Sequence, residues 1–173
     1  MKQLIITIIS ALPTLVCSVS VCVTDIKSRV VPRLWIIIAI FVQSLANLIC
    51  SIILFGNISL LIFGWISCVF AFAIYWIMRK IAPQNSLGFG DVTSAAMIAQ
   101  ALILFGFDCL IYWFALVGIV GLVWLLLWKI YCKIFSPTNA SIPFVPIEAL
   151  SAILAALLSI TTRSILSSCL LYT

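Results

Sequence analysis

Residues 34–78 read LWIIIAIFVQSLANLICSIILFGNISLLIFGWISCVFAFAIYWIM, a stretch without one charged side chain. A helix that crosses the ~30 Å hydrocarbon core of a bilayer needs about 20 apolar residues, so this stretch is long enough for two. Gly56 and Asn57 stand near its middle and form a pair typical of a tight turn between apolar runs. The stretch therefore predicts a helical hairpin, with membrane helices at 34–55 and 59–78.

The rest of the chain has the same character. Of its 173 residues, 66% are apolar and 8% charged, whereas soluble domains have about 45–50% and 25%. The apolar runs are continuous rather than alternating, which favours helices over a membrane β-barrel. Charge-free intervals add helices at 3–24, 92–107, 110–131 and 146–166. We therefore expect an all-α membrane protein with about six transmembrane helices in a single domain over residues 1–173, which excludes a soluble enzyme, a nucleic-acid reader and a disordered tail.

The basic residues indicate how these helices are oriented. Lys and Arg next to membrane helices are retained on the cytoplasmic side. If the N-terminus lies outside, only Lys2 and Arg163 fall on the outer face. The first helix is expected to stay uncleaved, because its apolar run continues through Val23 without a small-x-small cleavage site. The other basic residues then lie in the inner loops: Lys27, Arg29, Arg33, Arg79, Lys80, Lys129 and Lys133.

The polar residues limit the possible chemistry. The chain has no histidine, and none of its seven cysteines forms a C-x-x-C pair, so transition-metal sites and Ser-His or Cys-His catalysis lose their usual ligand or base. We expect no metal and no cofactor, with cysteine acting as a small buried apolar residue. Aromatic residues near the predicted helix ends are expected to anchor the helices at the membrane surface. These are Trp35, Trp76, Trp113, Trp128 and Tyr131.

Two of the four acidic residues can meet. Asp25 ends the first predicted helix and Asp91 begins the fourth, so the expected topology puts both at the cytoplasmic boundary. Ionisable groups at membrane depth are costly and usually functional. A simpler interpretation of each stays open: Asp25 is an interfacial acid balanced by Lys27 or Arg29, and Asp91 is the N-cap of its helix.

The other two acids have ordinary interpretations. Asp108 falls between the fourth and fifth predicted helices and is expected to be a solvated turn residue. Glu148 follows Pro143 and Pro146 and is expected in the first turn of the last helix, where a negative charge suits the helix start.

Three short motifs surround the acids. Asp91 ends the sequence LGFGD at residues 87–91, in which Gly88 and Gly90 allow positive φ angles and close backbone approach. Asp25 opens the sequence DIKSRVVP, which ends at Pro32, and the sequence IPFVP at 142–146 precedes the last helix. Three ordered motifs on one membrane face are far more specific than any one of them.

This combination resembles the type IV prepilin peptidases, membrane aspartic proteases of the GxGD class, over nearly the whole chain. It is similar to the short, peptidase-only members, because the cytoplasmic region with paired C-x-x-C motifs that accompanies N-methyltransferase activity is absent. The chain differs from the family at Arg33, Thr93 and Val145, where Asn, Lys and Gly respectively are common, and it keeps both aspartates.

The resemblance implies a site and a substrate. It makes Asp25 and Asp91 the catalytic residues, with no cofactor. It also implies a substrate, a prepilin or pseudopilin-like precursor whose short basic leader is cut beside an apolar helix. The cleavage would take place at the cytoplasmic face of a prokaryotic inner membrane, where membrane lipids are the other partners. A further hypothesis gives Glu148, on the same face, a contact with a basic residue of that leader.

The chemistry itself needs two neighbouring carboxyl groups. One activates a water molecule and the other donates a proton to the leaving amine. Because two like charges a few ångströms apart do not both ionise easily, the pair shares one proton, and either aspartate could be the base. Two other functions stay open at this point: a small transporter or channel component that binds cations or protons at these acids, and a catalytically silent assembly factor.

Overall fold

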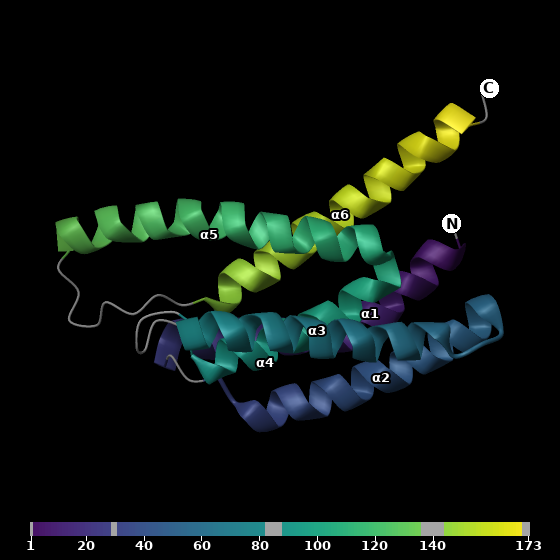
Figure 1. Ribbon diagram of the computed structural model, residues 1–173, viewed down its shortest axis with the longest axis horizontal. Coiled ribbons are helices and arrows are strands. Elements are labelled where there is room, and N and C mark those ends of the chain that lie inside the picture. Colours follow the sequence, from purple (N-terminus) through teal and green to yellow (C-terminus); the bar gives the residue numbers. More distant parts are fainter. Residues whose placement is uncertain (1, 29–30, 82–87, 136–143, 171–173) are drawn as a thin grey trace.

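The computed structural model describes residues 2–28, 31–81, 88–135 and 144–170. In these ranges the backbone forms six α-helices and one 3₁₀ turn, with no strand, so the all-α prediction is confirmed. The helices run alternately up and down, and Figure 1 shows the start of α1 and the end of α6 at the same end of the bundle. The elements are α1 (Lys2–Ser28), α2 (Arg33–Phe55), α3 (Ser59–Ile81), α4 (Phe89–Leu102), η1 (Ile103–Phe105), α5 (Phe107–Phe135) and α6 (Val145–Leu170).

Five of these helices, all except α4, are long and apolar enough to cross a membrane. Their positions confirm the predicted helices at 3–24, 34–55, 59–78, 110–131 and 146–166, with ends that differ by up to a few residues. Large apolar side chains cover their outer surfaces, as contact with lipid requires. The chain is therefore a multi-pass membrane protein.

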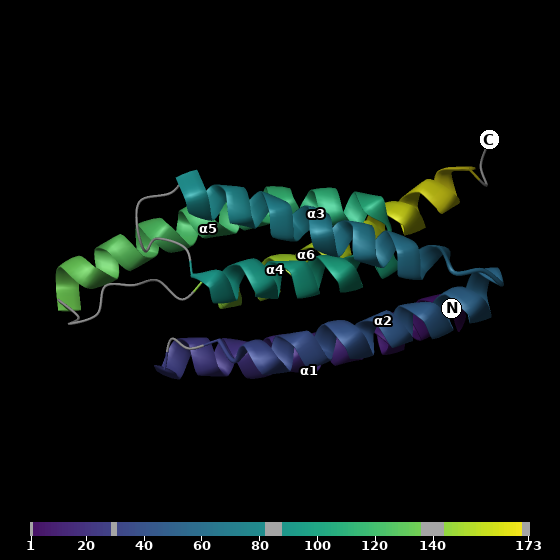
Figure 2. The same ribbon diagram turned by 60° about the horizontal axis from the view of Figure 1, so that its bottom comes forward.

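The fourth helix differs from the prediction of a membrane span at 92–107. α4 has 14 residues, which corresponds to about 21 Å at 1.5 Å per residue. It contacts each of the other five α-helices, and every residue from Ser94 to Leu102 is buried. Figure 2 shows α4 enclosed between α3 and the α1–α2 pair. Because α4 meets protein rather than lipid, it does not need the length of a lipid-facing helix.

The turn between α2 and α3 confirms the predicted hairpin. Gly56 ends α2 with a φ of +64°, the left-handed conformation that glycine adopts without strain, and its N–H donates to the Ile52 carbonyl at 3.0 Å. The side chain of Asn57 then accepts a hydrogen bond from the Ser59 N–H at 3.0 Å. Both residues therefore satisfy backbone groups that helix ends leave unpaired.

A chain of buried polar side chains joins three helices inside the bundle. Thr14 of α1 donates to the Oε1 atom of Gln43 on α2 at 2.8 Å. Gln43 in turn donates to Asn47 at 2.8 Å, and Asn47 donates to the Gln100 carbonyl of α4 at 3.1 Å. Gln43, Asn47 and Gln100 have no exposed surface. A shift of any of these three helices along its axis would leave the buried groups unpaired. The chain of bonds therefore fixes the position of α4 relative to α1 and α2.

Replacing Gln43 with leucine should therefore destabilise the bundle. The change removes the acceptor of Thr14 and the donor to Asn47, and we expect the free energy of unfolding to fall by about 1–2 kcal/mol. Denaturant titration of the purified protein in detergent micelles measures it. Gln3→Leu, the same change at an exposed position of α1, is the matched control, and equal stability of the two variants would contradict the prediction.

Candidate active site

Three of the four acidic residues gather at one end of the bundle, where α1 and α3 end and α2, α4 and α6 begin. We call this the Asp25 end. Asp25 lies near the end of α1 and is 6% exposed, Asp91 lies in the first turn of α4, and Glu148 lies in the first turn of α6 with no exposed surface. The Asp25 and Asp91 carboxyl groups are near enough to interact electrostatically, and Glu148 interacts with both. Asp25 and Asp91 thus lie at the same end of the bundle, although 66 positions separate them in the sequence.

The start of α4 holds Asp91 in place. The helix begins after Gly88, and Asp91 is its third residue rather than its N-cap, so the N-cap interpretation is wrong by three positions. The Oδ2 atom of Asp91 accepts a hydrogen bond from the Gly88 N–H at 2.9 Å. A carboxylate at this position satisfies a backbone donor and lies at the positive end of the helix dipole. Asp91 therefore stabilises the helix start and also interacts electrostatically with the other two acids.

The glycines beside Asp91 serve close approach rather than positive φ. Gly88 has a φ of −71°, and the glycines with positive φ in the described ranges are Gly56 and Gly106, so that half of the expectation is wrong. A Cβ atom at Gly90 would lie 2.5 Å from the Cβ atom of Val31. Only glycine lets the segment before α2 approach α4 this closely.

The motif before the last helix reaches Asp25. Val145 is the first residue of α6, and its backbone N–H donates to the Oδ2 atom of Asp25 at 3.3 Å. Pro146 follows in the first turn of α6, where a missing N–H costs no helical hydrogen bond. At the other motif, the carbonyl of Pro32 accepts hydrogen bonds from the first turn of α2. Pro143, Arg29 and Leu87 lie outside the described residues.

Glu148 occupies the predicted helix position in an unexpected setting. It lies in the first turn of α6, as expected. Its side chain is fully buried, however, and the contact with a basic leader residue stays a prediction. The Oε2 atom of Glu148 is hydrogen-bonded to the Ser94 hydroxyl of α4, and its carboxyl group lies beside the Tyr75 hydroxyl of α3.

Three residues that surround Glu148 were not among the predicted site residues. Trp113 was expected at the membrane surface but is fully buried, because its ring stacks on Tyr75 and its Nε1–H donates to the Glu148 carbonyl at 3.1 Å. Ser94 follows Asp91 by three positions, a spacing that puts both on one helix face and was the available signal for it. Tyr75 gives no such signal, since its role depends on how α3 packs.

Basic and aromatic side chains surround the glycine motif. The guanidinium of Arg33 lies 5.1 Å from the ring centre of Phe89, and that of Arg79 lies 5.4 Å from the same ring. Both are cation–π contacts of ordinary length. Arg33, one of the three residues that differ from the prepilin-peptidase motifs, thus links α2 to the start of α4. Thr93, another departure, donates back to the Gly90 carbonyl of its own helix at 2.9 Å.

The fourth acid lies at the opposite end of the bundle. Asp108 is in the first turn of α5, accepts a hydrogen bond from Ser159 at 2.7 Å and forms an ion pair with Arg163 of α6. The expectation of a simply solvated turn residue is therefore wrong, because the packing of α5 against α6 brings Arg163 to it. Asp108 joins two helices and takes no part in the acid cluster.

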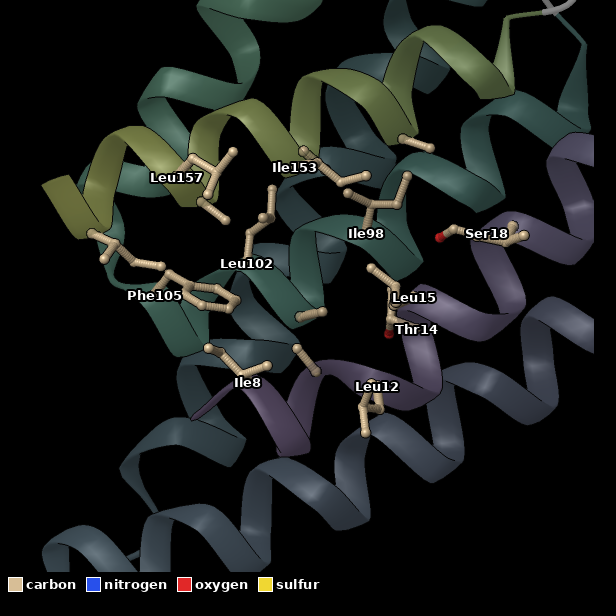
Figure 3. A pocket seen from close by; sticks show the side chains of 17 residues that line it. Ile8, Leu12, Thr14, Leu15, Ser18, Ile98, Leu102, Phe105, Ile153 and Leu157 are labelled. Carbon is tan, nitrogen blue, oxygen red and sulfur yellow. The ribbon is translucent and has the colours of Figure 1, made fainter. Parts of the chain in front are cut away.

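An apolar groove lies in the membrane-spanning part of the bundle. It has a volume of about 260 Å³ and lies between α1, α6 and the α4–η1 segment. Figure 3 shows Ile8, Leu15 and Ser18 from α1 on one side and Ile153 and Leu157 from α6 on the other. Ala149 also lines the groove, whereas Asp25, Asp91 and Glu148 do not.

The cluster has the composition of an acid–base site. Within the described ranges, no three His, Cys, Asp or Glu side chains are arranged to hold a metal ion. Two of the carboxyl groups, Asp25 and Asp91, come from different helices and interact electrostatically, and a pair of neighbouring carboxyl groups can activate a water molecule and return a proton. Comparisons of the chain with protein-family models, with curated proteins and with solved structures found no match.

Proposed function

We propose that this protein is a membrane aspartic endopeptidase of the prepilin-peptidase type. It removes the short basic leader of a prepilin or pseudopilin-like precursor at the cytoplasmic face of a prokaryotic inner membrane. One observation carries the proposal: Asp25 and Asp91, which belong to separate motifs, lie together at one end of the bundle, and the N–H of Val145 in the third motif bonds to Asp25. The motifs on which the resemblance rests thus converge on one site.

In the proposed reaction the two aspartates act as one unit. The ionised member takes a proton from a water molecule, which attacks the carbonyl carbon of the scissile peptide. The protonated member gives its proton to the leaving amine as the C–N bond breaks, so the pair ends with one proton, as it began. Sharing one proton between two adjacent carboxyl groups is the stable arrangement, because two neighbouring negative charges repel.

The position of the acids supports a membrane substrate. They lie where the helices begin and end, at the boundary that a leader in water and an apolar helix in lipid would both reach. The groove between α1, α6 and the α4–η1 segment is lined almost entirely by apolar side chains and lies in the membrane-spanning part of the bundle. A peptide cut beside a membrane helix needs these two environments next to each other. A proton or cation pathway would instead favour acids near the bilayer midplane.

Co-expression with a candidate prepilin tests the proposal. The wild-type chain should shorten the precursor, and N-terminal sequencing should place the new end directly before the apolar helix. The double variant D25N/D91N, produced at the same level in the membrane, should leave the precursor intact. A wild-type chain that processes no prepilin, but carries an ion or proton flux that the double variant lacks, would overturn the peptidase proposal in favour of transport.

A further inference from the structure

Glu148 has no role in a mechanism that uses two aspartates, yet it is the most buried acid of the cluster. Burying a carboxyl group away from water is costly unless it finds partners. The first turn of α6 contains two groups that bond to neighbouring helices. The Val145 N–H bonds to Asp25 of α1, and the Glu148 side chain, in the same turn, bonds to Ser94 of α4. This turn therefore bridges the helices that carry Asp25 and Asp91.

The hydrogen bonds around Ser94 indicate the protonation state of Glu148. The Oγ atom of Ser94 lies 3.0 Å from the carbonyl oxygen of Asp91 and is also hydrogen-bonded to Oε2 of Glu148. A serine hydroxyl has a single proton, and a carbonyl oxygen can only accept. If Glu148 is protonated, each of the two contacts has a proton of its own, whereas an ionised Glu148 leaves the single Ser94 proton shared between two acceptors, which weakens both bonds.

The surroundings of Glu148 favour the same state. Its Oε1 atom and the Tyr75 hydroxyl are both buried, and neither has another hydrogen-bond partner among the described residues. The groups that face the Glu148 carboxyl are hydroxyls, a thiol and two further acids, and a third negative charge beside two aspartates would be repelled. By helix they are Asp25 and Cys22 of α1, Tyr75 of α3, and Asp91 and Ser94 of α4, with the uncharged Trp113 of α5 bonded to the Glu148 backbone.

We propose that Glu148 is a positioning residue: an uncharged carboxylic acid that links the first turn of α6 to α4 through Ser94 and thereby sets the spacing of Asp25 and Asp91. Its effect on catalysis rests on the proposed function, whereas its protonation does not. Because the role needs a hydrogen-bonding group of the right length and no charge, glutamine should replace it and alanine should not.

The kinetic test compares Glu148→Gln with Glu148→Ala on a purified prepilin in proteoliposomes. Glutamine should keep kcat within about twofold of wild type with an unchanged pH profile, and alanine should lower kcat about tenfold with KM unchanged, as expected when reacting groups are misplaced. Ser151→Ala is the matched control, because Ser151 is equally buried one turn further along α6. A pH profile shifted by glutamine, or full activity with alanine, would overturn the proposal. If Glu148→Ala does not fold, Ser94→Ala removes the same hydrogen bond from the α4 side and is compared with wild type instead.

Infrared difference spectroscopy tests the protonation state without any substrate. At neutral pH, the spectrum of wild type minus Glu148→Gln in lipid should contain the carbonyl stretch of a protonated carboxylic acid, exchangeable in D₂O. The chain has only four acidic side chains, so the assignment is direct, and Asp108→Asn should not remove the band. A difference spectrum with carboxylate bands instead would overturn the proposal, even if the protein cleaved its substrate normally. A protein that cleaves nothing but shows the band would refute the proposed function alone.

Discussion

Replacing either Asp25 or Asp91 with asparagine should lower leader cleavage by about 10²–10⁴-fold, the contribution of a positioned acid or base. Asparagine keeps the size of the side chain and an oxygen that can accept the hydrogen bonds from Val145 and Gly88. It removes only the ability to hold or release the proton. Since both aspartates are needed for one proton cycle, D25N/D91N should be no slower than the worse single variant. Initial rates with purified enzyme and prepilin in proteoliposomes measure this.

The control for these variants lies at the opposite end of the bundle. Asp108→Asn makes the same chemical change to an acid that pairs with Arg163 and lies far from the cluster. It should leave the cleavage rate within about twofold of wild type, since partly exposed ion pairs contribute little stability. Normal processing by either Asp25→Asn or Asp91→Asn would show that the two carboxyl groups do not act as a unit.

The second large effect is expected at Gly90, which has no side chain of its own. Gly90→Ala would put a Cβ atom 2.5 Å from the Cβ atom of Val31, and that contact is too close to the backbone for a rotamer change to relieve. The segment before α2 must then move by about an ångström relative to Asp91. A displacement of that size at a reacting group costs about 10²-fold in rate, and we expect this loss of cleavage together with a lower unfolding temperature.

A matched glycine and a second substitution isolate this cause. A Cβ atom at Gly118 on α5 would have no neighbour within 4 Å, so Gly118→Ala should keep full activity and raise stability slightly. Combining Gly90→Ala with Val31→Gly removes the colliding atoms and should restore most of the lost activity, which a double-mutant cycle quantifies. A Gly90→Ala variant as active as Gly118→Ala would refute the close-approach argument.

The fold was predictable to the extent that lipid determines it. The hairpin at 34–78 was predictable because charge-free length and the pair Gly56-Asn57 are local signals. α4 departed from the prediction because the number of apolar residues does not say whether a helix faces lipid or protein. Its burial depends on packing, through contacts such as that between Asn47 and Gln100, which lie 53 positions apart.

The sequence indicated which residues to consider for the candidate site, but it did not indicate how other helices enclose them. The rarity of acids and their equal depth made Asp25 and Asp91 the candidates, and the motifs indicated the start of the last helix. Glu148 was expected at a helix start and was found there, yet its burial could not be predicted, because it depends on how Ser94, Tyr75 and Trp113 enclose it from three other helices. Asp108 was misjudged for the same reason, since its partner Arg163 is 55 positions away.

The enclosure of α4 also bears on the order in which the acid cluster assembles in a newly made chain. α1, α2 and α3 are long enough to enter the bilayer as the ribosome releases them, whereas α4 needs neighbours to bury Gln100 and Ser94. α6 is synthesised after all of them and brings the Val145 N–H and Glu148 to the acids. A nascent chain that has not yet delivered α6 therefore has both aspartates but lacks the α6 groups that contact the cluster.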